Sequence, residues 1–307
     1  MRQHLILSPT TLLAMKTHIR NLSKCTHLPI VVGLVSLATS NASLISVNFH
    51  VGDDGDNQAA HELDGTEDAG IARTRTSSWN NVSIGAGGTN AAAAQIFAPA
   101  NLTDDTGSAA GTLTSTLTAG TTDQWFGGYG GSSAAGEAEL TNGISDDGLF
   151  NSYLALNGPN GDGSPLDNFV LTISGLGSEF TDNGYTIIIY SDTDRGGAGV
   201  TSNAARTSVF TISAGGSTST LLTEDDNATI RTFNGTYIAS DGSGAGTNYS
   251  NFVESGPLTE DSFSIEVTSP DGGRGGISGF QIVAIPEPSS LGLLGLGLLG
   301  LAVRRRR

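Results

Sequence analysis

The chain has 307 residues, with 30 acidic against 14 basic side chains and a formal net charge of −16. Its single cysteine, Cys25, lies close to the N-terminus, so no disulfide framework can stabilise the rest of the chain. The acidic excess excludes nucleic-acid binding through neutralisation of phosphates.

The first 42 residues predict a secretion signal. Residues 28–38 form an apolar stretch, and Ser40-Asn41-Ala42 puts small residues where a signal peptidase reads, so we expect Sec export and cleavage after Ala42. Met15 begins a complete signal by itself and is the alternative start. The stretch before residue 28 contains four basic residues and no acidic one: Arg2, Lys16, Arg20 and Lys24.

Residues 43–285 form the predicted body. They hold 29 acidic residues and six arginines, a net charge of −23, with no lysine and no cysteine. Such a charge favours solubility in salty surroundings. About 240 residues suffice for one large β domain or two small ones.

Short apolar runs separated by Gly, Asp and Asn turns predict strands throughout the body. In residues 44–50, Ile45, Val47 and Phe49 alternate with polar residues and form the expected core face. Residues 185–190 are apolar on both faces, which predicts a central strand. The other expected strands are 78–82, 112–118, 169–173, 209–212, 229–238, 263–267 and 277–285. We expect an all-β, jelly-roll-like sandwich with long Gly/Asp-rich loops, flanked by an N-terminal signal helix and a C-terminal hydrophobic helix.

Two acidic loops are candidates for structural calcium. One contains Asp53, Asp54 and Asp56, and the other contains Asp192 and Asp194. Carboxylates at alternate positions in a flexible loop resemble calcium ligands, although neither loop has the full EF-hand pattern. Ordinary acidic turns are the alternative interpretation, and no other cofactor is expected.

Three aromatic residues are candidates for stacking on sugar rings, namely Trp79, Trp125 and Tyr129. Trp125 and Tyr129 lie in a glycine-rich stretch, which favours exposure. The alternative is that both tryptophans anchor the core.

No catalytic residue is assigned. The body contains His50 and His61 but no cysteine and no Gly-x-Ser-x-Gly elbow. Pairs of adjacent acidic residues are frequent, but a glycosidase needs two carboxylates facing one sugar bond, which sequence cannot show.

The last 22 residues combine three unlike elements. Residues 286–288 read Pro-Glu-Pro and favour extended chain. Residues 289–303 are uncharged and mostly apolar, and the 13 residues from 291 onward would span roughly 20 Å as a helix, short of a bilayer core. Arg304, Arg305, Arg306 and Arg307 favour the cytoplasmic side. The pattern predicts a marginal stop-transfer segment, with the body of the protein on the outer side of the membrane. An ordinary membrane anchor is the alternative.

This order of elements resembles the PEP-CTERM sorting tail of exported bacterial proteins. The resemblance implies that a membrane-embedded exosortase recognises Pro286, Glu287 and Pro288 and removes the tail. It further implies a protein of the cell envelope, cell surface or extracellular matrix, transiently anchored in the membrane and associated with exopolysaccharide or biofilm. A carbohydrate-binding module is the alternative function, and a secreted glycoside hydrolase or esterase is the third. The body is similar in character to the β-rich domains that precede such tails, notably at Trp79-Asn80-Asn81.

Overall fold

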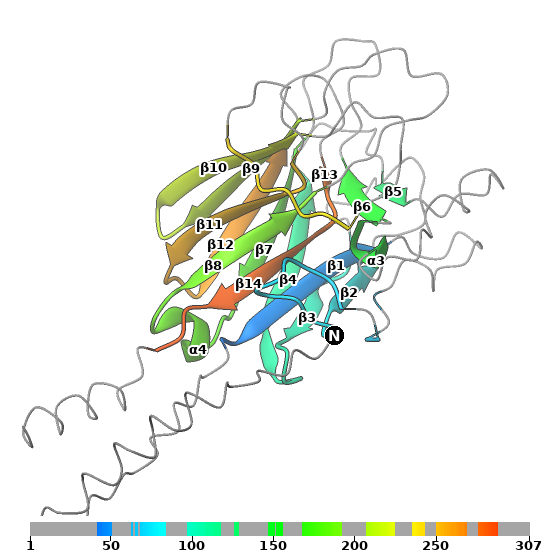
Figure 1. Ribbon diagram of the computed structural model, residues 1–307. Helices are drawn as coiled ribbons and strands as arrows, with labels where there is room; N and C mark the ends of the chain where they lie inside the picture. The colour runs from blue at the N-terminus through cyan, green and yellow to red at the C-terminus, as the bar shows by residue number, and fades with distance from the viewer. Residues whose placement is uncertain are drawn as a thin grey trace, which may run out of the picture. The chain divides into compact units, whose positions relative to one another are not determined.

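The computed structural model describes residues 42–50, 63, 65–66, 68–83, 97–117, 126–128, 147–150, 152–155, 168–191, 207–224, 235–242, 250–268 and 276–287. These residues form strands and two one-turn helices (Figure 1). The strands are β1 (Leu44–His50), β2 (Asn80–Ser83), β3 (Ala100–Thr103), β4 (Ala109–Leu117), β5 (Phe126–Gly128), β6 (Ser152–Ala155), β7 (Phe169–Ser174), β8 (Tyr185–Tyr190), β9 (Thr207–Ala214), β10 (Ser217–Glu224), β11 (Phe252–Leu258), β12 (Ser262–Thr268), β13 (Gly276–Ile277) and β14 (Gly279–Ala284). The helices are α3 (Asp147–Phe150) and α4 (Ser178–Thr181).

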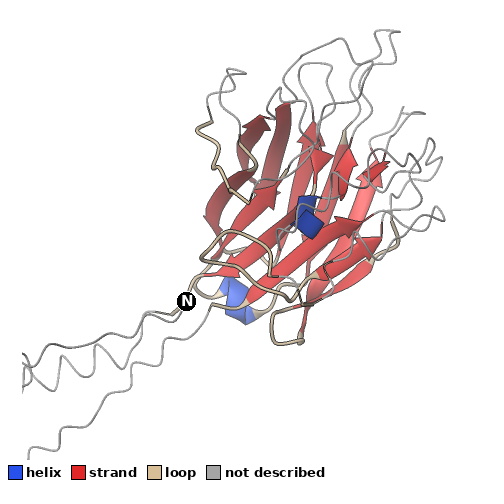
Figure 2. Cartoon of the chain, turned by 45° about the vertical axis from the view of Figure 1, so that its right-hand side comes forward, coloured by secondary structure: helices blue, strands red, loops and turns tan. Residues whose placement is uncertain are grey.

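Two large sheets make up most of the described body, and strands dominate it (Figure 2). The five-stranded sheet has the order β11-β8-β14-β1-β2, and the six-stranded sheet has the order β10-β9-β12-β7-β4-β3. A small third sheet has the order β13-β6-β5. Neighbouring strands are antiparallel except β1 and β2, which run parallel. The all-β prediction is therefore confirmed.

The main core lies between the two large sheets. Ile45, Val47 and Phe49 of β1 are fully buried, as are Leu171 and Ile173 of β7 on the opposite sheet, and all belong to one apolar cluster. Each such side chain contributes about 1.5–3 kcal/mol by leaving water. The core faces predicted for residues 44–50 and 169–173 are confirmed.

The middle strands of the five-stranded sheet are buried on both faces. β8 lies between β11 and β14, and five of its six residues are buried, so the prediction of a central strand at residues 185–190 is confirmed. Ile188 and Tyr190 point away from the main core into a second apolar cluster. That cluster also contains Leu63, Ala69 and Ile71, which come from the long connection between β1 and β2. This connection therefore covers part of the sheet's outer face.

Some predictions of strands differ from the structure. Residues 235–238, expected to end a strand that starts at 229, have irregular backbone, and residues 229–234 lie outside the described part. β10 and β11 were not predicted, because β10 consists mostly of Ser and Thr and β11 contains Gly256 and Pro257, so that neither shows a clear apolar face. Both are edge strands, where one side of the backbone needs no partner. The helices expected at the two chain ends lie outside the described residues.

Candidate functional site

The sorting motif leaves the body directly from a central strand. β14 pairs with both β8 and β1, and its last residue, Ala284, donates from its N–H to the carbonyl of Ser43 (2.9 Å). The N–H of Ile285 then donates to the carbonyl of Gly184 (2.8 Å). Pro286 and Glu287 follow and are exposed. The motif therefore begins one residue after the last backbone contact that fixes β14.

The predicted signal-peptidase site lies beside the sorting motif. Leu44 of β1 pairs with Val283 of β14, so the start of one strand and the end of the other lie side by side, at the end of the sandwich that carries α4 (Figure 1). A pocket of about 300 Å³ includes residues of both ends in its lining: Ala42, Ser43, Pro286 and Glu287. The predicted signal-peptidase cleavage site and the start of the sorting motif thus lie on one surface of the body.

Trp79 is neither fully exposed to solvent nor fully buried in the core. Its side chain is half-buried, its indole N–H donates to the carbonyl of Thr76 (2.9 Å), and its ring meets Tyr190 edge to face at 6.3 Å. The Tyr190 hydroxyl in turn accepts from the N–H of Ile71 (3.1 Å) and donates to Oε1 of Gln281 (2.6 Å). These contacts fix the indole ring on a rigid support.

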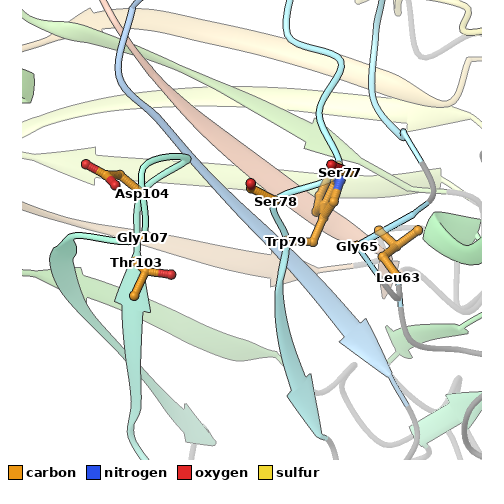
Figure 3. Close-up of a pocket in the computed structure, with 8 residues that line it drawn as sticks. All are labelled: Leu63, Gly65, Ser77, Ser78, Trp79, Thr103, Asp104 and Gly107. Carbon is orange, nitrogen blue, oxygen red and sulfur yellow. The ribbon is translucent and has the colours of Figure 1, made fainter.

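Trp79 lines an open pocket of about 350 Å³ (Figure 3). In that view Ser78 lies between Asp104 on one side and Trp79 with Leu63 on the other. We call this cavity the Trp79 pocket. Its lining residues are Leu63, Gly65, Ser77, Ser78, Trp79, Thr103, Asp104 and Gly107.

Asn80 joins the two walls of the Trp79 pocket. Its amide nitrogen donates to the carbonyls of Ser46 (2.9 Å) and Thr103 (2.8 Å). Its amide oxygen accepts from the backbone N–H of Thr103 (2.9 Å) and from the Thr103 hydroxyl (3.1 Å). Because Trp79 precedes Asn80 and Asp104 follows Thr103, these bonds set the separation of the tryptophan from the carboxylate.

Asn81 fixes a third wall. Its amide oxygen accepts from the N–H of Leu63 (3.2 Å), and its amide nitrogen donates to the carbonyl of Leu63 (3.0 Å). Nδ2 of Asn48 donates to the same amide oxygen of Asn81 (3.1 Å). The Trp79-Asn80-Asn81 tripeptide thus supplies one wall of the pocket and positions the two others.

Asp104 is held in its turn as a carboxylate. Oδ1 accepts from the N–H groups of Thr106 (2.9 Å) and Ser108 (2.9 Å) and from the Thr106 hydroxyl (2.6 Å). Burial by itself raises the pKa of Asp104, but these hydrogen bonds outweigh it and hold the pKa below the ordinary value of 3.8. Asp104 is therefore ionised at neutral pH and has its geometry fixed before any ligand arrives.

The sequence pointed to Trp79 but not to the residues that complete its pocket. In the sequence, Asp104 is distinguished only as a member of one of several pairs of adjacent acidic residues. The informative signal is the spacing Asp104, Thr106, Ser108 around Gly107, which favours a turn closed on the aspartate side chain. Asn80 and Asn81 were noted only as part of a tripeptide; their roles depend on partners 18 to 34 residues away.

The remaining predicted site residues lie outside the described residues. They are Asp53, Asp54, Asp56, Asp192, Asp194, Trp125, Tyr129, Pro288, Arg304, Arg305, Arg306 and Arg307. Within the described ranges, no group of three or more His, Cys, Asp or Glu side chains could hold a metal ion. No helix among the described residues is long and apolar enough to cross a membrane.

Comparison with known families identifies the C-terminal segment. Residues 284–307 match the PEP-CTERM protein-sorting motif. The match begins at the last residue of β14, where the chain leaves the sandwich. No curated protein matches the chain. The resemblance seen in the tail is thus confirmed, and it supports an exported protein that is sorted at the envelope by an exosortase.

Proposed function

We propose that this protein is a non-enzymatic component of the cell surface or extracellular matrix, associated with exopolysaccharide or biofilm. The observation that carries the proposal is the PEP-CTERM motif at residues 284–307, joined without a spacer to a folded body that is strongly acidic. The N-terminal signal features support the same route, since they are typical of Sec export followed by signal peptidase.

The sorting step that we propose is removal of the tail by an exosortase-type enzyme at Pro286-Glu287-Pro288. Pro286 and Glu287 are exposed, whereas Ala284 and Ile285 make backbone hydrogen bonds to the body. An enzyme that reads the motif in the folded protein therefore reaches it from Pro286 onward. The tail that follows holds the substrate at the membrane until the cut is made.

A carbohydrate-binding module is the second candidate function. The specific observation in its favour is that Trp79 lines an open, mostly polar pocket while its ring is held on Tyr190. A glycoside hydrolase or esterase is the third candidate. Turnover by the exported protein on a panel of glycosides and acyl esters would reverse this order.

Two finer assignments are also proposals. The jelly-roll connection of the sandwich is supported by its two packed, largely antiparallel sheets. Structural calcium in the acidic loops around Asp53 and Asp192 is supported by their ligand spacing, with no other cofactor proposed. Thermal melts with calcium or chelator at matched ionic strength test the calcium hypothesis, and a calcium-specific rise in Tm lost in Asp192→Ala would support it.

Cell fractionation tests the proposed function. The host expresses the wild-type chain, a variant with Pro286, Glu287 and Pro288 all replaced by alanine, and Pro99→Ala as a control for loss of an exposed proline. We expect wild type and the control in the surface and exopolysaccharide fractions, and the triple variant retained in the membrane fraction. Retention of all three proteins in one compartment would contradict the proposal.

A further inference from the structure

We propose that the Trp79 pocket binds a neutral sugar segment, with the indole ring as the stacking platform and Asp104 as the acceptor for sugar hydroxyls. The inference deepens the proposed association with polysaccharide and rests on it for the biological source of the sugar. It assigns the contact to one place on the body.

The first support is the composition and size of the pocket. Its volume of about 350 Å³ falls within the range of roughly 300–1,000 Å³ that is usual for small-molecule sites. One aromatic ring and the apolar side chain of Leu63 stand among three hydroxyl-bearing residues, a carboxylate and two glycines. A pyranose has the matching pattern, with apolar C–H faces above and below the ring and hydroxyl groups around its rim.

The second support is rigidity. Trp79 is fixed by its own N–H on Thr76 and by the edge of Tyr190, and Asn80 ties the Trp79 wall to the Asp104 wall through three hydrogen bonds to Thr103. A site whose walls are fixed beforehand loses little conformational entropy when a ligand binds. A half-buried tryptophan that only filled the core would need no such connection to a carboxylate across the pocket.

The third support is the chemistry of Asp104. Its Oδ1 is occupied by the turn, and its ionised state makes the carboxylate a strong acceptor, because hydrogen bonds to charged groups are about twice as strong as neutral ones. A sugar hydroxyl is a donor that suits the second oxygen of this carboxylate. Among the described residues that line the pocket, Asp104 is the one carboxylate, whereas glycoside hydrolysis needs two, so the geometry points to binding.

The charge of the body selects the class of sugar. Residues 43–285 carry a net charge of −23, and the pocket wall itself is anionic. Like charges brought together at an interface oppose binding, so uronic-acid or sulfated chains are disfavoured. The fitting ligand is a neutral hexose segment of a polysaccharide.

Isothermal titration of the full chain, purified in detergent, tests the proposal with cellohexaose, maltohexaose and mannohexaose as probes. We expect saturable binding of at least one hexaose. Trp79→Ala should abolish it, and Asp104→Asn should weaken it by about tenfold, as expected for loss of a charged hydrogen-bond acceptor. Trp125→Phe and Thr172→Ala, which alter the other tryptophan and a strand that does not line the pocket, should change Kd by no more than about twofold.

Thermal melts of each variant separate a loss of binding from a loss of folding. Should Trp79→Ala unfold, Asp104→Asn decides, since it keeps the shape of the side chain. No saturable binding of any hexaose by the wild type, or equal binding by wild type and a folded Asp104→Asn, would overturn the sugar site. Fractionation of the same variants in the host keeps the two proposals apart: a correctly sorted protein that binds no hexaose counts against the pocket alone.

Discussion

The outer faces of the two large sheets differ in what covers them. On the five-stranded sheet, Gln281 is fully buried beneath the connection between β1 and β2, and its side chain bonds to Thr74, Tyr190 and Ser46. On the six-stranded sheet, Thr172 and Ser264 are paired across neighbouring strands and half-exposed. The covered face fixes loop segments by polar contacts and places the Trp79 pocket at their margin, while the regular face carries partly exposed side chains such as Thr172, Ser264 and Glu266. Irregular chain, held by residues of β2 and β3, therefore forms most of the candidate site.

The largest expected effect comes from breaking the buried network on the covered face. Oε1 of Gln281 accepts from the Thr74 hydroxyl (2.7 Å) and the Tyr190 hydroxyl (2.6 Å), and Nε2 donates to the Thr74 carbonyl (2.9 Å). Gln281→Ala removes the buried hydrogen-bond partner of all three groups, so we expect the free energy of unfolding to fall by about 3–5 kcal/mol. Urea unfolding of the wild type and the variant measures this change in the free energy of unfolding.

The matched change on the regular face is Thr172→Ala. This half-exposed side chain lies at the middle of β7, and we expect a loss within about 0.5–1 kcal/mol. Equal losses in the two variants would show that the covering segment adds nothing to the sandwich and would contradict the comparison.

A smaller effect is expected at the junction between the two walls of the pocket. Asn80→Ala removes four hydrogen bonds that connect β2 to Ser46 and Thr103, so we expect a loss of about 2 kcal/mol in the free energy of unfolding. The substitution should also expose Trp79 to more water, which would be seen as a red shift of its fluorescence in a Trp125→Phe background.

Asn101→Ala is the control for Asn80→Ala, because Asn101 lies exposed on the neighbouring strand β3. We expect it to be neutral within about 0.5 kcal/mol and to leave the fluorescence unchanged. A spectrum of Asn80→Ala that matches the control would mean that Asn80 does not position the pocket.

How much the sequence could predict follows from the same contrast. Apolar alternation in residues 44–50, 169–173 and 263–267 predicts the core strands correctly, because those side chains all face one interior. Gln281 gave no such signal, since its partners come from residues 46, 74 and 190, far away in the chain. The strand β10 also gave none, because an edge strand with Ser and Thr on its outer face has no apolar period. Burial of polar groups by long connections is a tertiary property that local pattern cannot show.

The smallest effect of this series concerns the charge of Asp104. Its pKa in the folded protein is lowered from 3.8 by hydrogen bonds in its turn, so the carboxylate contributes stability above that value and loses it as the pH falls through the lower folded pKa. Asp104→Asn should therefore cost on the order of 0.5–1 kcal/mol at pH 7 and nothing at a pH below the lowered pKa of Asp104, where both side chains are neutral. Urea midpoints of the two proteins from pH 7 to pH 2.5 measure this convergence, and a constant difference would contradict it.

The intact mass of the exported protein tests the central claim most directly. The account predicts a mature chain that begins at Ser43 and has lost Arg304, Arg305, Arg306 and Arg307 with the rest of the tail, since Pro286 and Glu287, the first two residues of the motif, lie exposed after the end of β14. The same measurement on the triple alanine variant of the motif should show the full C-terminus. A wild-type protein recovered from the cell surface with Arg307 still attached would contradict the account.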